Sequence, residues 1–75
     1  MLTVKATYDL VRRFDADGGY SVLVEGQLAG LARPVVDRAG QVVGWSPCRV
    51  NGAQLGDPMD MLTAAARRVL IHFHH

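Results

Sequence analysis

The chain has 75 residues and a net charge of +1, from eight basic and seven acidic residues, so we expect residues 1–75 to be a single domain with one thin core. The near-neutral charge is unlike that of a dedicated nucleic-acid binder, and no apolar run approaches the ~18 residues of a membrane span. The lone cysteine excludes an internal disulfide and fits a cytoplasmic protein.

The first predicted element is a strand over about residues 3–14. Apolar and polar residues alternate there, as in a strand with one buried face. The apolar positions are Val4, Ala6, Tyr8 and Leu10. Turn-forming residues follow at 15–19. A second strand, over 20–25, should place its tyrosine and valines on one face and Leu23 on the other, and Gly26 marks the next turn.

Two further strands are expected over about residues 28–36 and 41–46. The first should bend near Pro34, because proline cannot donate a ladder hydrogen bond and belongs at a sheet edge or a bulge. The stretch VVDRAGQVV between them predicts a hairpin, since two valine pairs flank a turn that ends in a left-handed glycine. The pair Asn51-Gly52 predicts another turn, with a second, very small hairpin.

The last predicted element is a helix over about residues 58–72. Asp57 stands where an N-cap residue is expected, with Pro58 at the first helical position and Asp60 in the first turn. Apolar residues then recur at helical spacing: Leu62, Ala65, Ala66, Val69, Leu70 and Phe73. The sequence therefore predicts the α+β class, with a four-stranded antiparallel meander sheet followed by one C-terminal helix packed on one face.

The paired arginines Arg67 and Arg68 are explained most simply as helix residues. Acidic residues at the start of a helix and basic residues toward its end both complement the helix dipole, by a few tenths to about 1 kcal/mol each, so no ligand is needed. Other arginines are spread over strand ends and turns, and if they converged they could follow a phosphate backbone. This alternative nucleic-acid site consists of Arg12, Arg13, Arg33 and Arg49.

No group of residues indicates catalysis, a cofactor or a metal ion. His72 and His74 are two positions apart near the helix end, whereas a helical metal pair uses a spacing of four. Cys48 has no neighbouring base in the sequence and is expected to be a buried structural thiol. Glu25 is the only glutamate, and the aspartates stand in turns and at the helix start. We therefore expect a protein that is not an enzyme.

The face of the sheet that the helix leaves uncovered is the most suggestive surface. Val11 and Leu23 should lie near each other on it, with Val36 or Val42 joining them, and such an apolar face often marks a partner. The simplest partner is a second copy, so a homodimer is expected. Trp45 fits either a core position or an exposed contact. The candidate protein-binding residues are Val11, Leu23 and Trp45.

Two resemblances extend these expectations. The order DGGYSVLVEG … GDPMDMLTAAARRVL resembles the small β-β-β-α domain of HicB-like antitoxins, in which a tyrosine-bearing strand precedes a capped, alanine-rich helix; this resemblance implies toxin neutralisation. The positions that match in character are Tyr20, Gly56, Asp57, Ala64 and Ala65.

The composition carries the second resemblance. Seven arginines to one lysine and ten valines to one isoleucine follow GC-rich codons and suggest a high-GC source. A short, motif-free chain of this kind is similar to the small orphan proteins of actinobacterial phages. That resemblance implies a modulator that binds a phage or host protein, and it is the interpretation that we favour.

Overall fold

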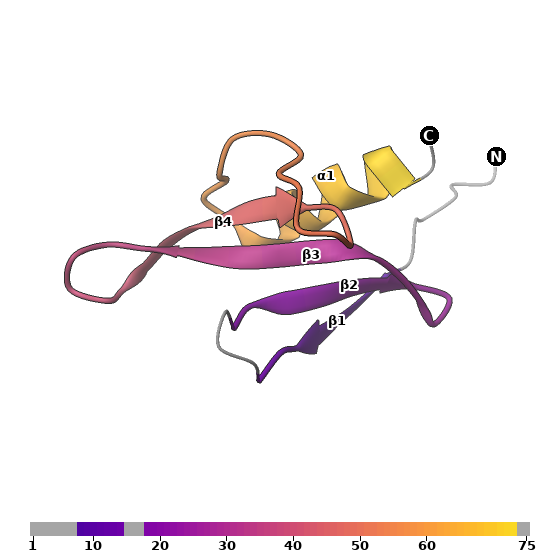
Figure 1. Ribbon diagram of the computed structural model, residues 1–75, viewed down its shortest axis with the longest axis horizontal. Coiled ribbons are helices and arrows are strands. Elements are labelled where there is room, and N and C mark those ends of the chain that lie inside the picture. Colours follow the sequence, from indigo (N-terminus) through magenta and orange to yellow (C-terminus); the bar gives the residue numbers. More distant parts are fainter. Residues whose placement is uncertain (1–7, 15–17, 74–75) are drawn as a thin grey trace, which may run out of the picture.

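The computed structural model describes residues 8–14 and 18–73, which form four strands followed by one helix. The elements are β1 (Asp9–Arg12), β2 (Tyr20–Val24), β3 (Gln27–Val36), β4 (Val42–Cys48) and α1 (Leu62–Phe73). The strands form an antiparallel sheet in the order β1-β2-β3-β4, and α1 packs on β3 and β4 (Figure 1). The predicted α+β class, with its meander sheet and C-terminal helix, is confirmed.

The alternating pattern of the first two strands decides which of their residues are buried. Val22 is fully buried, and Leu10 and Val24 pack against the same core cluster as the buried residues of α1. Because successive side chains of a strand point to opposite faces, Val11 and Leu23 face away from α1. The sequence pattern had placed the residues of β2 on these same two faces.

The observed strand bounds differ from the expected ones mainly in β1 and β4. β1 covers 9–12 of the expected 3–14, and the expected positions before residue 8 lie outside the described residues. β4 continues to Cys48, past the expected end at residue 46, because Pro47 and Cys48 remain paired with β3.

Tight turns connect β2 to β3 and β3 to β4. Glu25 and Gly26 have positive φ values of 51° and 78°, as a two-residue type I′ hairpin requires. In the next turn the Gly40 N–H donates to the Asp37 carbonyl oxygen at 3.0 Å, and Gly40 has a φ of 82°. The left-handed glycine predicted for this hairpin is therefore confirmed.

β3 is longer than β2 and, together with β4, projects beyond the rest of the sheet (Figure 1). The ladder between β2 and β3 ends at Tyr20 and Ala32, so Pro34 lies where β3 is paired with β4 alone. A register shift follows at Val35/Val36. Pro34 therefore occupies a local sheet edge beside a bulge, as its missing N–H predicts.

α1 begins at Leu62, so the expected helix start at residue 58, with Asp57 as its N-cap, is wrong. The Met59 N–H donates to the Trp45 carbonyl oxygen at 2.8 Å, and the Trp45 N–H donates to the Met59 carbonyl oxygen at 2.7 Å. This two-way pairing holds Met59 against β4 in an isolated β-bridge. The local capping signals are overridden by a contact with a residue far away in the sequence.

α1 approaches β3 very closely at Gly30. A Cβ atom at this position would lie 2.6 Å from Cγ1 of Val69 and 2.5 Å from the carbonyl oxygen of Cys48. The side of α1 that faces the sheet is also built from small residues, since Ala65 and Ala66 are both fully buried. The apolar stripe predicted for the helix is therefore confirmed, and it packs almost directly on the backbone of β3.

We expect Gly30→Ala to lower the free energy of unfolding by about 1–3 kcal/mol, as overpacking of a close contact does. Chemical denaturation followed by the fluorescence of Trp45 measures this loss. In a Val69→Ala background the glycine change should cost less, because one of the two contacts is gone. It should still cost something, since the Cys48 oxygen belongs to the backbone. An unchanged denaturation midpoint for Gly30→Ala would contradict the close approach.

Candidate functional site

The face of the sheet away from α1, called here the open face, carries a group of aliphatic side chains. Val11 pairs with Ser21, which pairs in turn with Leu31, and Leu23 pairs with Leu28. Cross-strand partners lie on the same face. Val11, Leu23, Leu28 and Leu31 therefore surround Ser21 on the open face, and these four residues are called the apolar patch.

The apolar patch is accessible in the part of the chain that the structure describes. Val11 is 52% exposed and Leu28 is 40% exposed, while Leu23 and Leu31 are partly buried. An antiparallel sheet with one solvated face usually carries polar residues on that face. Four aliphatic side chains grouped around Ser21, with Asp9 beside them opposite Leu23, depart from this rule, so the patch is the strongest candidate for a contact surface.

The sequence correctly predicted that Val11 and Leu23 share a face, but Val36 and Val42 do not join them. These two valines pair with each other near the tip of the projecting hairpin. Val36 is five residues from Leu31 along β3, or about 16 Å at about 3.3 Å per residue. The hairpin valines are therefore remote from the apolar patch.

Leu28 and Leu31 were missed by sequence reasoning. The two-residue turn at Glu25-Gly26 fixes the pairing of the strand ends, so it could have placed Leu28 opposite Leu23. Leu31 lies beyond the register shift at Val22/Leu23, which no local signal announces.

Trp45 lies on the α1 side of the sheet and is not part of the apolar patch. Trp45 pairs with Pro34 of β3, and Tyr20 pairs with Ala32 of the same strand, two positions away. The Tyr20 and Trp45 ring centroids are 5.7 Å apart with an angle of 60° between the planes, a favourable aromatic geometry. The partly buried indole thus belongs to packing across β3, and of its two readings the core position fits the structure.

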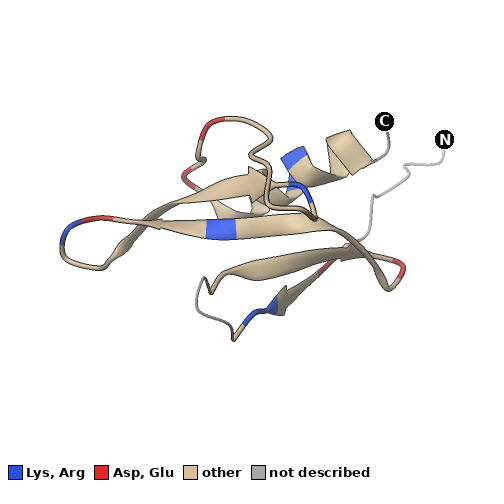
Figure 2. Cartoon of the chain, viewed as in Figure 1, with Lys and Arg blue, Asp and Glu red and all other residues tan. Residues whose placement is uncertain are grey.

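The arginines proposed as a nucleic-acid site lie on different parts of the molecule (Figure 2). Arg12 alternates with Val11 and lies on the α1 side of β1, whereas Arg49 follows the end of β4. The Arg13 N–H donates to the Gly19 carbonyl oxygen at 2.8 Å, which extends the β1–β2 register by one pair. Gly19 in turn lies against Arg33. Of the four arginines, Arg13 and Arg33 alone share a row on the open face.

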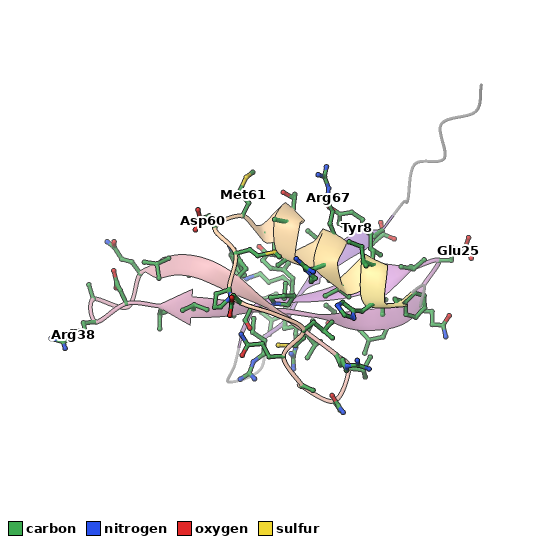
Figure 3. The ribbon with its side chains drawn as sticks, turned by 90° about the horizontal axis from the view of Figure 1, so that it is seen from above. Tyr8, Glu25, Arg38, Asp60, Met61 and Arg67 are labelled. Carbon is green, nitrogen blue, oxygen red and sulfur yellow. The ribbon has the colours of Figure 1, made fainter. Side chains whose placement is uncertain are left out.

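The position of α1 changes the explanation of Arg67 and Arg68. The first turn of the helix contains no acidic residue, since Asp60 precedes it, and the basic residue of the last turn is His72. Figure 3 shows Arg67 projecting outward from α1. Both arginines are exposed, so they are solvated residues of the middle of the helix, and the predicted pairing of acidic start and basic end is wrong.

A hollow of about 230 Å³, open to solvent, lies at the C-terminal end of α1. Its lining residues are Ala29, Arg49, Leu55, Val69, His72 and Phe73. It is smaller than the pockets of about 300–1,000 Å³ that usually bind small molecules. Arg49 and His72 are its two polar side chains, so it offers few groups to orient a ligand.

The remaining candidate groups for chemistry are isolated within the described residues. Cys48 is buried, as expected, and its Sγ lies 3.5 Å from the Ser46 carbonyl oxygen. No three His, Cys, Asp or Glu side chains gather to hold a metal ion in the described ranges. His72 is exposed on α1, and His74 lies outside the described residues.

No protein-family model, curated protein or solved structure matches the chain. Within the described residues, α1 is too short to span a bilayer. The functional inference therefore depends on the geometry of the open face, with the apolar patch over β1, β2 and β3 and the row of Arg13 and Arg33 beside it.

We expect the affinity for single-stranded DNA to depend only weakly on salt. Of the four arginines proposed for this site, two share the open face, and each neutralised phosphate contributes about 0.7 to the slope of log K against log salt, so binding there should give a slope no steeper than about −1.4. Titration of a labelled oligonucleotide between roughly 50 and 200 mM salt measures it. A slope near −2.8, about four phosphates, would contradict the dispersed arrangement of the arginines.

Proposed function

We propose that the protein is a non-catalytic protein-binding module that self-associates and contacts a target protein through its open face. The observation that carries the proposal is the apolar patch. Contiguous exposed apolar surface is uncommon on monomeric proteins and marks interaction sites more often than isolated exposed residues do.

The composition of the patch supports contact with a protein. Its side chains are aliphatic, whereas surfaces that bind single-stranded nucleic acid without sequence preference offer aromatic rings for stacking. The side chains of Tyr20 and Trp45 pack on the other face of the sheet. An apolar protein surface is therefore a better match for the open face than a nucleic acid. The expected target remains a phage or host protein, as the sequence resemblance implies.

The nucleic-acid alternative is favoured by one observation, the common row of Arg13 and Arg33 beside the patch. It predicts binding that disappears when nucleic acid is digested. Binding through the apolar patch predicts the opposite, because burial of aliphatic surface needs no phosphate.

We expect Leu23→Asp to weaken target binding at least about tenfold. Burying one leucine contributes about 1.5–3 kcal/mol, and 1.4 kcal/mol corresponds to a factor of ten in affinity. The tagged full-length chain is used to capture proteins from a nuclease-treated lysate of a high-GC bacterium. The captured protein is identified by mass spectrometry and then titrated in purified form.

Ile71→Asp is the matched control, since Ile71 is an aliphatic residue that is 54% exposed on α1, away from the open face. It should leave target binding unchanged. Circular dichroism should show that both variants stay folded. Equal binding by the wild type and Leu23→Asp, or capture that vanishes with nuclease, would overturn the proposal.

A further inference from the structure

The two edge strands of the sheet, β1 and β4, differ in whether another part of the chain is bonded to their outer side. Beside β4 the chain returns along the strand: the Leu55 N–H donates to the Pro47 carbonyl oxygen at 2.8 Å, and Trp45 and Met59 are bridged in both directions. Within the described residues nothing pairs with the outer side of β1. An edge strand of this kind is a template for another strand.

The hydrogen bonds of β1 identify the backbone groups on its outer side. The Arg13 N–H is directed at Gly19 of the β2 side. Along an antiparallel strand every second residue directs its backbone N–H and C=O groups toward the same neighbouring strand, so the N–H and C=O groups of Asp9 and Val11 also point toward β2. The N–H and C=O groups of Leu10 and Arg12 therefore point outward, where a further strand would bind them.

We propose that β1 pairs antiparallel with β1 of a second copy, with Val11 opposite Val11 across a two-fold axis. This dimer would extend the sheet continuously through both copies. The inference rests on the self-association in the proposed function and specifies which surface performs it.

The register is selected by charge. With Val11 on the axis, Asp9 of each copy lies opposite Arg13 of the other, on the open face, and the outward groups of Leu10 and Arg12 bond each other. Opposite charges in directly facing positions stabilise strand pairs. The symmetry produces this Asp9–Arg13 pair twice, once on each side of the axis.

The two neighbouring registers are less favourable. In any allowed register the open-face residues of one β1 must lie opposite the open-face residues of the other. The nearest registers that keep the faces aligned place Leu10 or Arg12 on the two-fold axis in place of Val11. An axis at Arg12 sets two arginines opposite each other, and like charges in facing positions are destabilising. An axis at Leu10 sets the charged Asp9 opposite the apolar Val11 and removes the charge pair.

The same register accounts for an exposed aromatic ring. Phe14 is 88% exposed, the highest value among the large hydrophobic side chains described, and the Arg12 guanidinium carbon lies 5.7 Å from its ring centroid. The Val11-centred register sets Phe14 opposite Tyr8 of the second copy, on the α1 side. Aromatic pairs in facing positions are among the favourable cross-strand pairs.

Cysteine cross-linking of the full-length chain tests the register directly. In facing positions without hydrogen bonds the Cα atoms are about 4.5 Å apart, within the range of about 4.4–6.8 Å that a disulfide spans. We expect Val11→Cys to form a covalent dimer under mild oxidation, several-fold more than Leu23→Cys does on non-reducing gels. The wild type controls for Cys48, which is buried.

Leu10→Cys and Arg12→Cys report the two competing registers, and a higher yield from either one would overturn the Val11-centred pairing. A yield from Leu23→Cys equal to that from Val11→Cys would overturn edge pairing, because it indicates that two open faces stack against each other. Absence of cross-linking in all four variants would also overturn it.

Arg12→Pro tests the edge without a cysteine. The Arg12 N–H points outward, so proline removes a bond of the dimer and none to β2. We expect light scattering to show a dimer for the wild type and for Arg12→Thr, and a monomer for Arg12→Pro, whose circular dichroism spectrum should still match that of the wild type. A monomeric wild type would overturn the edge inference. Target capture that remains sensitive to Leu23→Asp would show that binding through the open face still holds.

Discussion

The fold depends on the short distance between α1 and β3. Gly30 has no side chain, Val69 of α1 occupies the space above it, and Ala66 is fully buried beside them. Dispersion attraction falls steeply with small gaps, so small residues on both sides allow many contacts from few atoms. A short chain that cannot bury many large side chains gains its core in this way. The same closeness leaves little room for any added atom.

The position of this contact decides which surfaces remain accessible. A helix of 12 residues is about 18 Å long, at about 1.5 Å per residue. Because α1 is anchored on β3 at Gly30, it covers β3 and β4 and makes fewer contacts with the first two strands. The open face and the outer side of β1 are both left without a covering element in the part of the chain that is described.

Features that depend on neighbouring residues could be predicted from the sequence. Alternation placed Val11 and Leu23 on one face, and the turn glycine at Gly40 is required by its own hairpin. Features that depend on distant residues could not. The pairing of Met59 with Trp45 delays the helix start, and it follows from the path of the loop between them. Alternation also leaves open which face of a strand is covered, so it could not decide whether Trp45 belongs to the core.

The difference between the two edges bears on how large an assembly can become. A chain with two free edges could add copies without limit, and such contacts produce fibres. Here the segment from Leu55 to Met59 is bonded along β4, so that edge has few groups left to offer. Pairing of β1 with β1 across a two-fold axis would then use the outer side of β1 in both copies at once. The assembly would close at two copies, with the two apolar patches side by side around Val11, and a target could contact both.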